Sequence, residues 1–195
     1  MDWEGRAADF VLHVAKMLGE PAPLALDYGA TKAASLAVAG RRIEILAGRL
    51  FEIEVEVTLP GFPSHACVTY APEGLYTRAK LLEEGSEQTR AVAGVEVFDQ
   101  KFLVLGAGAS LVLARLASEA LDALCEADHL RPDIKTMKFV WGQPPEAYVH
   151  LRAQPSAEHF GRVDAGTLDP KHAVQAVEDT VALAARLERA WSPPP

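Results

Sequence analysis

Apolar residues of the N-terminal segment recur every three or four positions and predict a helix over residues 4–18. The apolar positions are Ala7, Phe10, Val11, Val14, Met17 and Leu18. This spacing places their side chains on one face of a helix. We expect Gly19 to end the helix, because Pro21 and Pro23 follow it and proline does not continue a helix.

From Ala34 to Ala71 the apolar period changes to two, which is typical of β-strands. In the segment 51–58, apolar Phe51, Ile53, Val55 and Val57 alternate with Glu52, Glu54, Glu56 and Thr58. That alternation predicts a strand with one buried and one wet face. We predict further strands at 35–39, 42–46 and 65–71. The glutamates would meet cross-strand arginines, with Arg41, Arg42 and Arg49 as candidates.

Residues 72–96 lack a sustained apolar period and predict a long exposed loop, with a short strand near 75–78. Regular structure resumes with a predicted strand over 98–105. After the turn at 106–110, one amphipathic helix is expected. Its apolar stripe is Leu113, Leu116, Ala117, Ala120, Leu121 and Leu124.

Two strands, 134–141 and 147–153, are predicted next, joined by a hairpin at 142–145. Asp169 and Pro170 have the residue types of a helix start, and they predict a helix to about Ala190. The chain therefore predicts an α+β fold, with antiparallel sheet or sheets packed against N-terminal, central and C-terminal amphipathic helices. We expect a single domain over 1–195, with 72–96 as the place where it would subdivide.

Composition narrows the class of protein. The chain has 195 residues, of which 49% are hydrophobic and 24% charged, as in ordinary globular proteins. Its formal net charge of -8 argues against nucleic acid as a partner, which needs clustered cations. No apolar run approaches the ~20 residues of a membrane span, and the acidic N-terminus does not resemble a secretory signal. We expect a cytoplasmic protein in which Cys67 and Cys125 are free, buried thiols.

The segment Gly106-Ala107-Gly108 lies between a predicted strand and a predicted helix, where glycine-rich loops bind phosphate. Leu111 stands where a dinucleotide-binding motif has its third glycine, and no Gly-Lys-Ser/Thr of a P-loop follows. We therefore interpret the segment as a plain turn and expect no cofactor.

The histidines, serines and cysteines do not have the spacing of a metal-binding or catalytic motif. The histidines are His13, His65, His129, His150, His159 and His172. None belongs to a metal-ligand spacing, and no serine lies in a Gly-x-Ser-x-Gly elbow. His65 and Cys67 share a face of a predicted strand, as a catalytic thiol pair would, but chance placement on one face is the favoured interpretation. We expect no catalytic residue and no metal site.

Five residues are candidates for an interaction surface. Glu52, Glu54 and Glu56 would bind a cation or a basic peptide, or else form the hydrated face of a sheet. Trp141 and Tyr148 flank the last predicted hairpin, where aromatic side chains cap an interaction surface or simply end half-buried strands.

Two resemblances add to this picture. The run Phe98-Asp99-x-x-Phe102-x-Val104, followed by a leucine-rich helix, resembles a set of uncharacterised bacterial proteins over about residues 74–140. That resemblance implies a bacterial origin and no particular activity. The predicted element order is similar to the secretion-chaperone-like fold, which implies an acidic dimer that binds other proteins.

Taken together, we expect a non-enzymatic protein-binding, adaptor or chaperone-like module that forms a homodimer or binds another protein. Two alternatives remain open. One is a helix-grip small-molecule-binding protein or enzyme, in which the last helix closes a curved sheet over a cavity. The other is an immunity or antitoxin-type partner, because acidic small proteins can neutralise basic ones.

Overall fold

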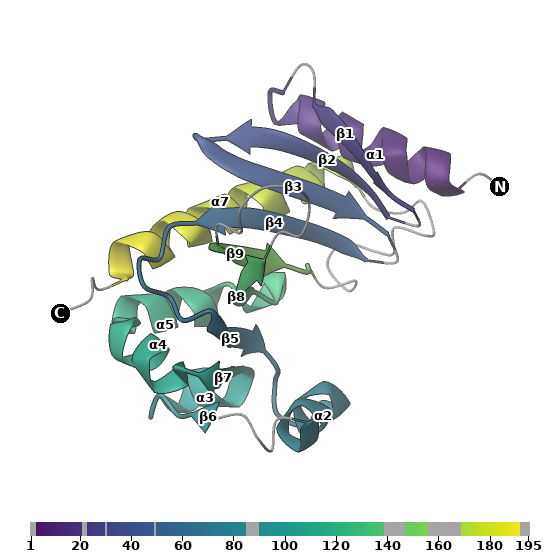
Figure 1. Cartoon of the computed structure of the whole chain (residues 1–195). Coiled ribbons are helices and arrows are strands. Elements are labelled where there is room, and N and C mark those ends of the chain that lie inside the picture. Colours follow the sequence, from purple (N-terminus) through teal and green to yellow (C-terminus); the bar gives the residue numbers. More distant parts are fainter. Residues whose placement is uncertain are drawn as a thin grey trace. The chain divides into compact units, whose positions relative to one another are not determined.

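Figure 1 shows the computed structural model of the chain. It describes residues 3–20, 23–29, 31–48, 50–84, 90–138, 147–155 and 169–191. The chain divides into two units. Unit 1 comprises 1–56, 129–131 and 152–182, and unit 2 comprises 57–128, 132–151 and 183–195. The fold class is α+β, as predicted.

Unit 1 is built on an antiparallel meander of β1 (Leu24–Tyr28), β2 (Thr31–Val38), β3 (Arg41–Ala47) and β4 (Phe51–Val57), whose last residue belongs to unit 2. Helix α1 (Trp3–Met17) packs across β2 and β3 (Figure 1). The sheet buries the alternate residues Ile43, Ile45, Ile53 and Val55. Along each strand these buried residues are two positions apart, as expected for one buried sheet face.

Unit 2 contains the antiparallel strand order β8-β5-β7-β6. These strands are β5 (His65–Tyr70), β6 (Arg90–Ala91), β7 (Phe102–Ala107) and β8 (Asp133–Lys138). Its helices are α2 (Tyr76–Glu84), α3 (Glu96–Lys101), α4 (Ala109–Arg115) and α5 (Ser118–Glu126). One face of the β5–β7 pair carries Val68 and Val104, which lie opposite one another and are fully buried.

Besides β4, three elements contribute to both units: strand β9 (Ala147–Ala153), the short helix η1 (Asp128–Leu130) and helix α7 (Pro170–Ala190). Helix α7 begins where the sequence predicts it. The Asp169 carboxylate accepts a hydrogen bond from the Lys171 backbone N–H at 2.9 Å, which satisfies one of the unpaired donors of the first turn.

Most predicted elements are confirmed. Helix α1 and strands β2, β3, β4, β5, β8 and β9 lie where the apolar periods place them, and Gly19 follows α1 with a φ of 91°. The predicted hairpin at 142–145 and residues 139–141 of its first strand lie outside the described residues. The edge strand β1 was not predicted.

The prediction for residues 72–96 is wrong. This segment is not a long loop with a strand near 75–78, because it contains helix α2, strand β6 and the start of α3. The strand predicted over 98–105 is also wrong in its first half, where 98–101 belong to α3. The Asp99 carboxylate accepts backbone N–H groups of Ala93 at 3.0 Å and Gly94 at 2.8 Å, which orders the entry to that helix.

The single central helix is also corrected, because α4 and α5 are separate helices. Leu116 and Ala117, which lie between the two helices, both have extended backbone conformations. Leu116 also forms a β-bridge with Trp191. A contact with a residue 75 positions later in the chain (191 − 116) thus interrupts an apolar stripe that looks continuous in sequence.

Candidate functional site

The wet face of the unit 1 sheet concentrates carboxylates. Glu52, Glu54 and Glu56 alternate with the buried residues of β4, as predicted. Glu44 on β3 lies directly opposite Glu54. Glu44, Glu52 and Glu54 expose only 16, 18 and 15% of their side chains, so they are more sheltered than free surface glutamates.

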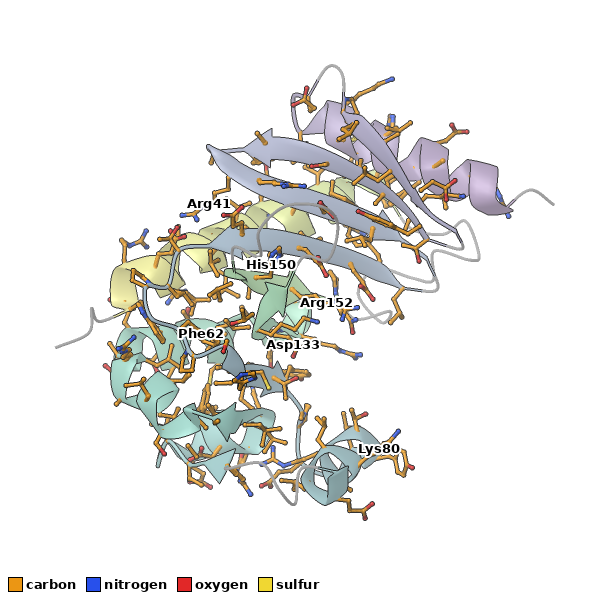
Figure 2. All side chains as sticks on the ribbon, in the orientation of Figure 1. Arg41, Phe62, Lys80, Asp133, His150 and Arg152 are labelled. Carbon is orange, nitrogen blue, oxygen red and sulfur yellow. The ribbon has the colours of Figure 1, made fainter. Side chains whose placement is uncertain are left out.

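Arg152 brings a positive charge to this face (Figure 2). Its guanidinium donates two hydrogen bonds to Glu52, one of them from Nε at 3.0 Å, and its Nε lies 3.9 Å from Glu54 Oε1. Gln154 Nε2 donates to the other Glu52 oxygen at 2.9 Å. Glu52 is therefore held on both oxygens, as expected for a structural carboxylate rather than an open cation ligand.

The arginine found at Glu52 and Glu54 is not one of the predicted ones. Arg42 Nη2 donates to Glu44 Oε1 at 3.1 Å along its own strand, while Glu52 takes its arginine from β9. Arg49 lies outside the described residues. A sequence shows which side chains share a face of a strand, but not which distant strand lies beside it.

Strand β1 lies at one side of the unit 1 sheet and extends this face. Its five residues pair in antiparallel register with β2, and no described strand pairs with its other side. Leu24, Leu26 and Tyr28 share one face of the strand. Leu24 is 62% exposed and Tyr28 51%, while Leu26 is half-buried. Exposed apolar side chains on an unpaired edge are unusual, because natural edges are normally protected by charge, proline or a bulge.

The charged residue of β1 is neutralised within its own hairpin. Lys32 Nζ lies 2.9 Å from both carboxylate oxygens of Asp27, and the Gly29 backbone N–H donates to Asp27 Oδ1 at 2.9 Å. These hydrogen bonds lower the pKa of Asp27 from its usual value, with that from Lys32 the largest cause. The aspartate therefore does little to repel another strand from the edge.

Tyr28 connects β1 with the acidic face. Its hydroxyl donates to Glu44 Oε2 at 3.5 Å, a long hydrogen bond. Partial burial raises the pKa of Tyr28, and the neighbouring Glu44 carboxylate raises it further. The phenol stays neutral at physiological pH, so the exposed side of β1 carries little net charge of its own.

No protein-family model matches the chain, and neither a curated protein nor a solved structure matches it significantly. The two resemblances noted in the sequence therefore stay predictions.

Chemistry at the two thiols is disfavoured by their surroundings. Cys67 and Cys125 are free and half-buried. Burial raises the pKa of both, and Asp133 raises that of Cys67 further. A raised pKa reduces the thiolate that would act as nucleophile, and His65, the suggested partner of Cys67, has an exposed side chain.

The glycines at 106–108 have a packing role. A Cβ at Gly106 would lie 1.8 Å from the backbone oxygen of His65 on the paired strand, and φ at this position is 97°. Only glycine fits that close approach. The turn is shorter than predicted, because Gly106 and Ala107 belong to strand β7 and α4, only seven residues long, begins at Ala109. The steric requirement at Gly106 therefore comes from the pairing of β7 with β5.

The other two predicted site residues, Trp141 and Tyr148, stay predictions. Trp141 and His159 lie outside the described residues, and Tyr148 is in β9, with a side chain that is not described. Among the described residues, no group of three or more His, Cys, Asp or Glu side chains is arranged to hold a metal ion. Likewise, no described helix is long and apolar enough to cross a membrane.

Sequence reasoning missed β1 and Arg152. The signal for β1 is present in the run Leu24-Ala-Leu-Asp-Tyr28, which lies between Pro23 and Gly29 and partly alternates. The run is short and uncharged except for Asp27, so it is easily overlooked beside the longer strands. Arg152 has no such signal, because its role depends on pairing with a glutamate 100 residues away.

Proposed function

We propose that this chain is a non-enzymatic protein-binding module that associates with a second copy of itself through strand β1. The observation that carries the proposal is the outer side of β1, which no described strand pairs, together with the exposed Leu24 and Tyr28. Adding a strand to an open sheet edge is a common way for proteins to associate, because main-chain hydrogen bonds supply affinity.

The sequence of β1 is suited to pairing with itself in antiparallel register. A two-fold axis at Leu26 places Leu24 opposite Tyr28 of the second copy and Leu26 opposite its own equivalent. Aliphatic and aromatic cross-strand pairs of this kind are favourable. Asp27 then faces Ala25 of the second copy rather than another carboxylate. The register thus places apolar groups together and separates like charges.

The overall charge opposes this association but does not act at the edge itself. Two chains of formal charge -8 repel each other, and this long-range repulsion is screened by salt. At the edge, the Asp27 carboxylate is already paired with Lys32. We therefore expect the dimer to become tighter as the salt concentration rises.

We place this protein in the cytoplasm, where reducing conditions keep thiols such as Cys67 and Cys125 free. Support for a non-enzymatic role comes from the raised pKa values of both thiols and from the steric role of Gly106.

Light scattering of the purified full chain tests the proposal. The wild-type protein is expected to have twice the mass of one chain, and Leu24→Lys is expected to shift it to the mass of a single chain. A lysine on an edge strand opposes strand addition without entering the core. The matched control is Leu50→Lys, because Leu50 is also in unit 1 and is 52% exposed.

Leu50→Lys should keep the dimer mass. A wild-type chain that stays monomeric at high protein and salt concentration overturns the proposal. So does a dimer that survives Leu24→Lys, because its interface would then lie elsewhere.

A further inference from the structure

Helix α2 is held in unit 2 by unusually few apolar contacts. Of its described side chains only Arg78 is buried, at 7% exposed, and Leu81 is half-buried. Tyr76 is 80% exposed, and Leu82 is also exposed. A surface helix normally buries a stripe of apolar side chains. At nine residues, α2 is too short to be stable alone, so its few tertiary contacts must hold it.

Arg78 provides the main anchor. Its Nη1 donates to the backbone oxygens of Ala71 at 2.7 Å and Gln100 at 3.1 Å, and its Nη2 donates to the oxygen of Asp99 at 2.7 Å. Two of these carbonyls belong to the C-terminal end of α3, where unpaired carbonyls attract a cation. One side chain of α2 thus joins the helix to two other segments of unit 2.

The anchor carries an electrostatic cost. Burial lowers the pKa of the Arg78 guanidinium, and the nearby positive charge of Arg90 lowers it further. Both effects disfavour the buried cation relative to a hydrated one. The hydrogen bonds of Arg78 are therefore partly offset, and an open state with a hydrated arginine lies closer in free energy.

Beneath α2 lies an apolar patch made of Ala71, Leu103 and Leu105, with Cys67 packed against it. Leu105 lies opposite Cys67 across the β5–β7 pair, and Leu103 lies opposite Thr69. These residues are on the face of the strand pair that does not carry Val68 and Val104. Leu81 of α2 packs on this apolar patch, which we call the covered patch.

We propose that α2 is a separable cover that opens from the covered patch when Arg78 releases its three carbonyls, while the rest of unit 2 stays folded. Opening breaks the hydrogen bonds of one side chain and exposes Leu103, Leu105 and Cys67. The opposite face of the strand pair keeps its buried core, including Phe98 stacked on Phe102 at a ring distance of 5.0 Å. The opening is thus local, like the sub-global openings seen where few apolar contacts hold an element.

The rate at which Cys67 is alkylated reports this opening. The full chain is used with Cys125→Ser, so that Cys67 is the single thiol, and iodoacetamide is the probe. Arg78→Met keeps the bulk of the side chain and removes the hydrogen bonds. We expect it to raise the alkylation rate roughly tenfold or more, because charge-assisted hydrogen bonds are lost only from the closed state. In the closed state, burial also holds the pKa of Cys67 above its usual value, which slows the reaction further.

Lys80→Met is the matched control, since it removes the same charge from an exposed position of the same helix (Figure 2). Its alkylation rate should stay within about twofold of the parent, as expected for an exposed charge. Equal rates for Arg78→Met and Lys80→Met overturn the proposal. The proposal also fails if Arg78→Met speeds alkylation but the alkylation rate depends on urea as steeply as global unfolding does. The whole of unit 2 would then be opening, and not α2 alone.

Hydrogen exchange of the wild-type chain provides a test that does not depend on a variant that folds. The α2 amides are expected to exchange through an opening with a shallow urea dependence, well before those of β7. If α2 and β7 amides exchange together and only through global unfolding, α2 is a fixed part of unit 2 and the proposal fails.

Discussion

Helix α1 packs across strands β2 and β3 of unit 1, while helix α2 packs on the covered patch of unit 2 through Leu81, and the two are attached by different chemistry. Helix α1 buries Ala7, Val11, Val14 and Ala15, and its Phe10 ring meets Phe51 edge to face at 5.8 Å. Among its described side chains, helix α2 buries one arginine and partly buries one leucine. Apolar burial is non-directional and survives small shifts, whereas the arginine anchor is lost as soon as its geometry changes. The difference separates a permanent part of a core from a cover that can open.

A charge in the apolar stripe of α1 is expected to have the largest effect. Val14→Asp places an unpaired carboxylate at a fully buried position, which costs several kcal/mol, comparable with the whole stability of a small domain. Circular dichroism should show loss of structure or a strongly lowered melting temperature. His13→Asp, at an exposed position of the same helix, is the control and should stay folded. A Val14→Asp protein with wild-type stability would mean that α1 is no more firmly attached than α2.

Arg115 offers an intermediate case, a buried arginine beside the ring of Trp191. Its Nη1 donates to the backbone oxygens of Pro60 at 3.0 Å and Gly61 at 2.7 Å, and its guanidinium lies 5.8 Å from the ring centre of Trp191. Trp191 Nε1 also donates to the Pro60 oxygen at 3.1 Å. We expect Arg115→Met to lower the free energy of unfolding by about 1–3 kcal/mol.

Urea denaturation followed by tryptophan fluorescence measures this loss. Arg78→Met should lower the free energy of global unfolding less than Arg115→Met does, because it releases α2 alone. If Arg78→Met lowers the free energy of unfolding as much as Arg115→Met does, both arginines belong to the cooperative core. The distinction between apolar and polar attachment would then be wrong.

The smallest effect is expected from acidification at the β1–β2 hairpin. The folded pKa of Asp27 is lowered, so its pairing with Lys32 stabilises the hairpin above the unfolded pKa and is lost as the pH falls through the folded value. Below about pH 4 the Gly29 amide, which donates to Asp27, should lose protection in hydrogen exchange, while amides of α1 should not.

Asp27→Asn is expected to remove this pH dependence and leave α1 unchanged. If the amides of α1 lose protection at acid pH as much as the Gly29 amide does, the expected difference is wrong. Apolar attachment would then be as sensitive to acid as polar attachment.

Much of unit 1 could be predicted because its elements are strongly periodic. The stripe of α1 and the alternation of β4 each repeat over several turns or residue pairs, and the wet face of Glu52, Glu54 and Glu56 follows from the same alternation. The site was predicted less completely. Strand β1 is short, and Arg152 reaches Glu52 only because β9 is placed beside β4 by the fold.

In unit 2, the sequence did not predict helix α2 or the break between α4 and α5. The sequence by itself determined where side chains alternate or recur, and it placed Asp169 at the start of α7, because these signals involve neighbours along the chain. Only the tertiary structure decided that 76–84 form a helix, through Arg78 and Leu81, and that the central helix breaks at Leu116, through its bridge to Trp191. Contacts between distant residues outweigh a weak local preference, and no local pattern records them.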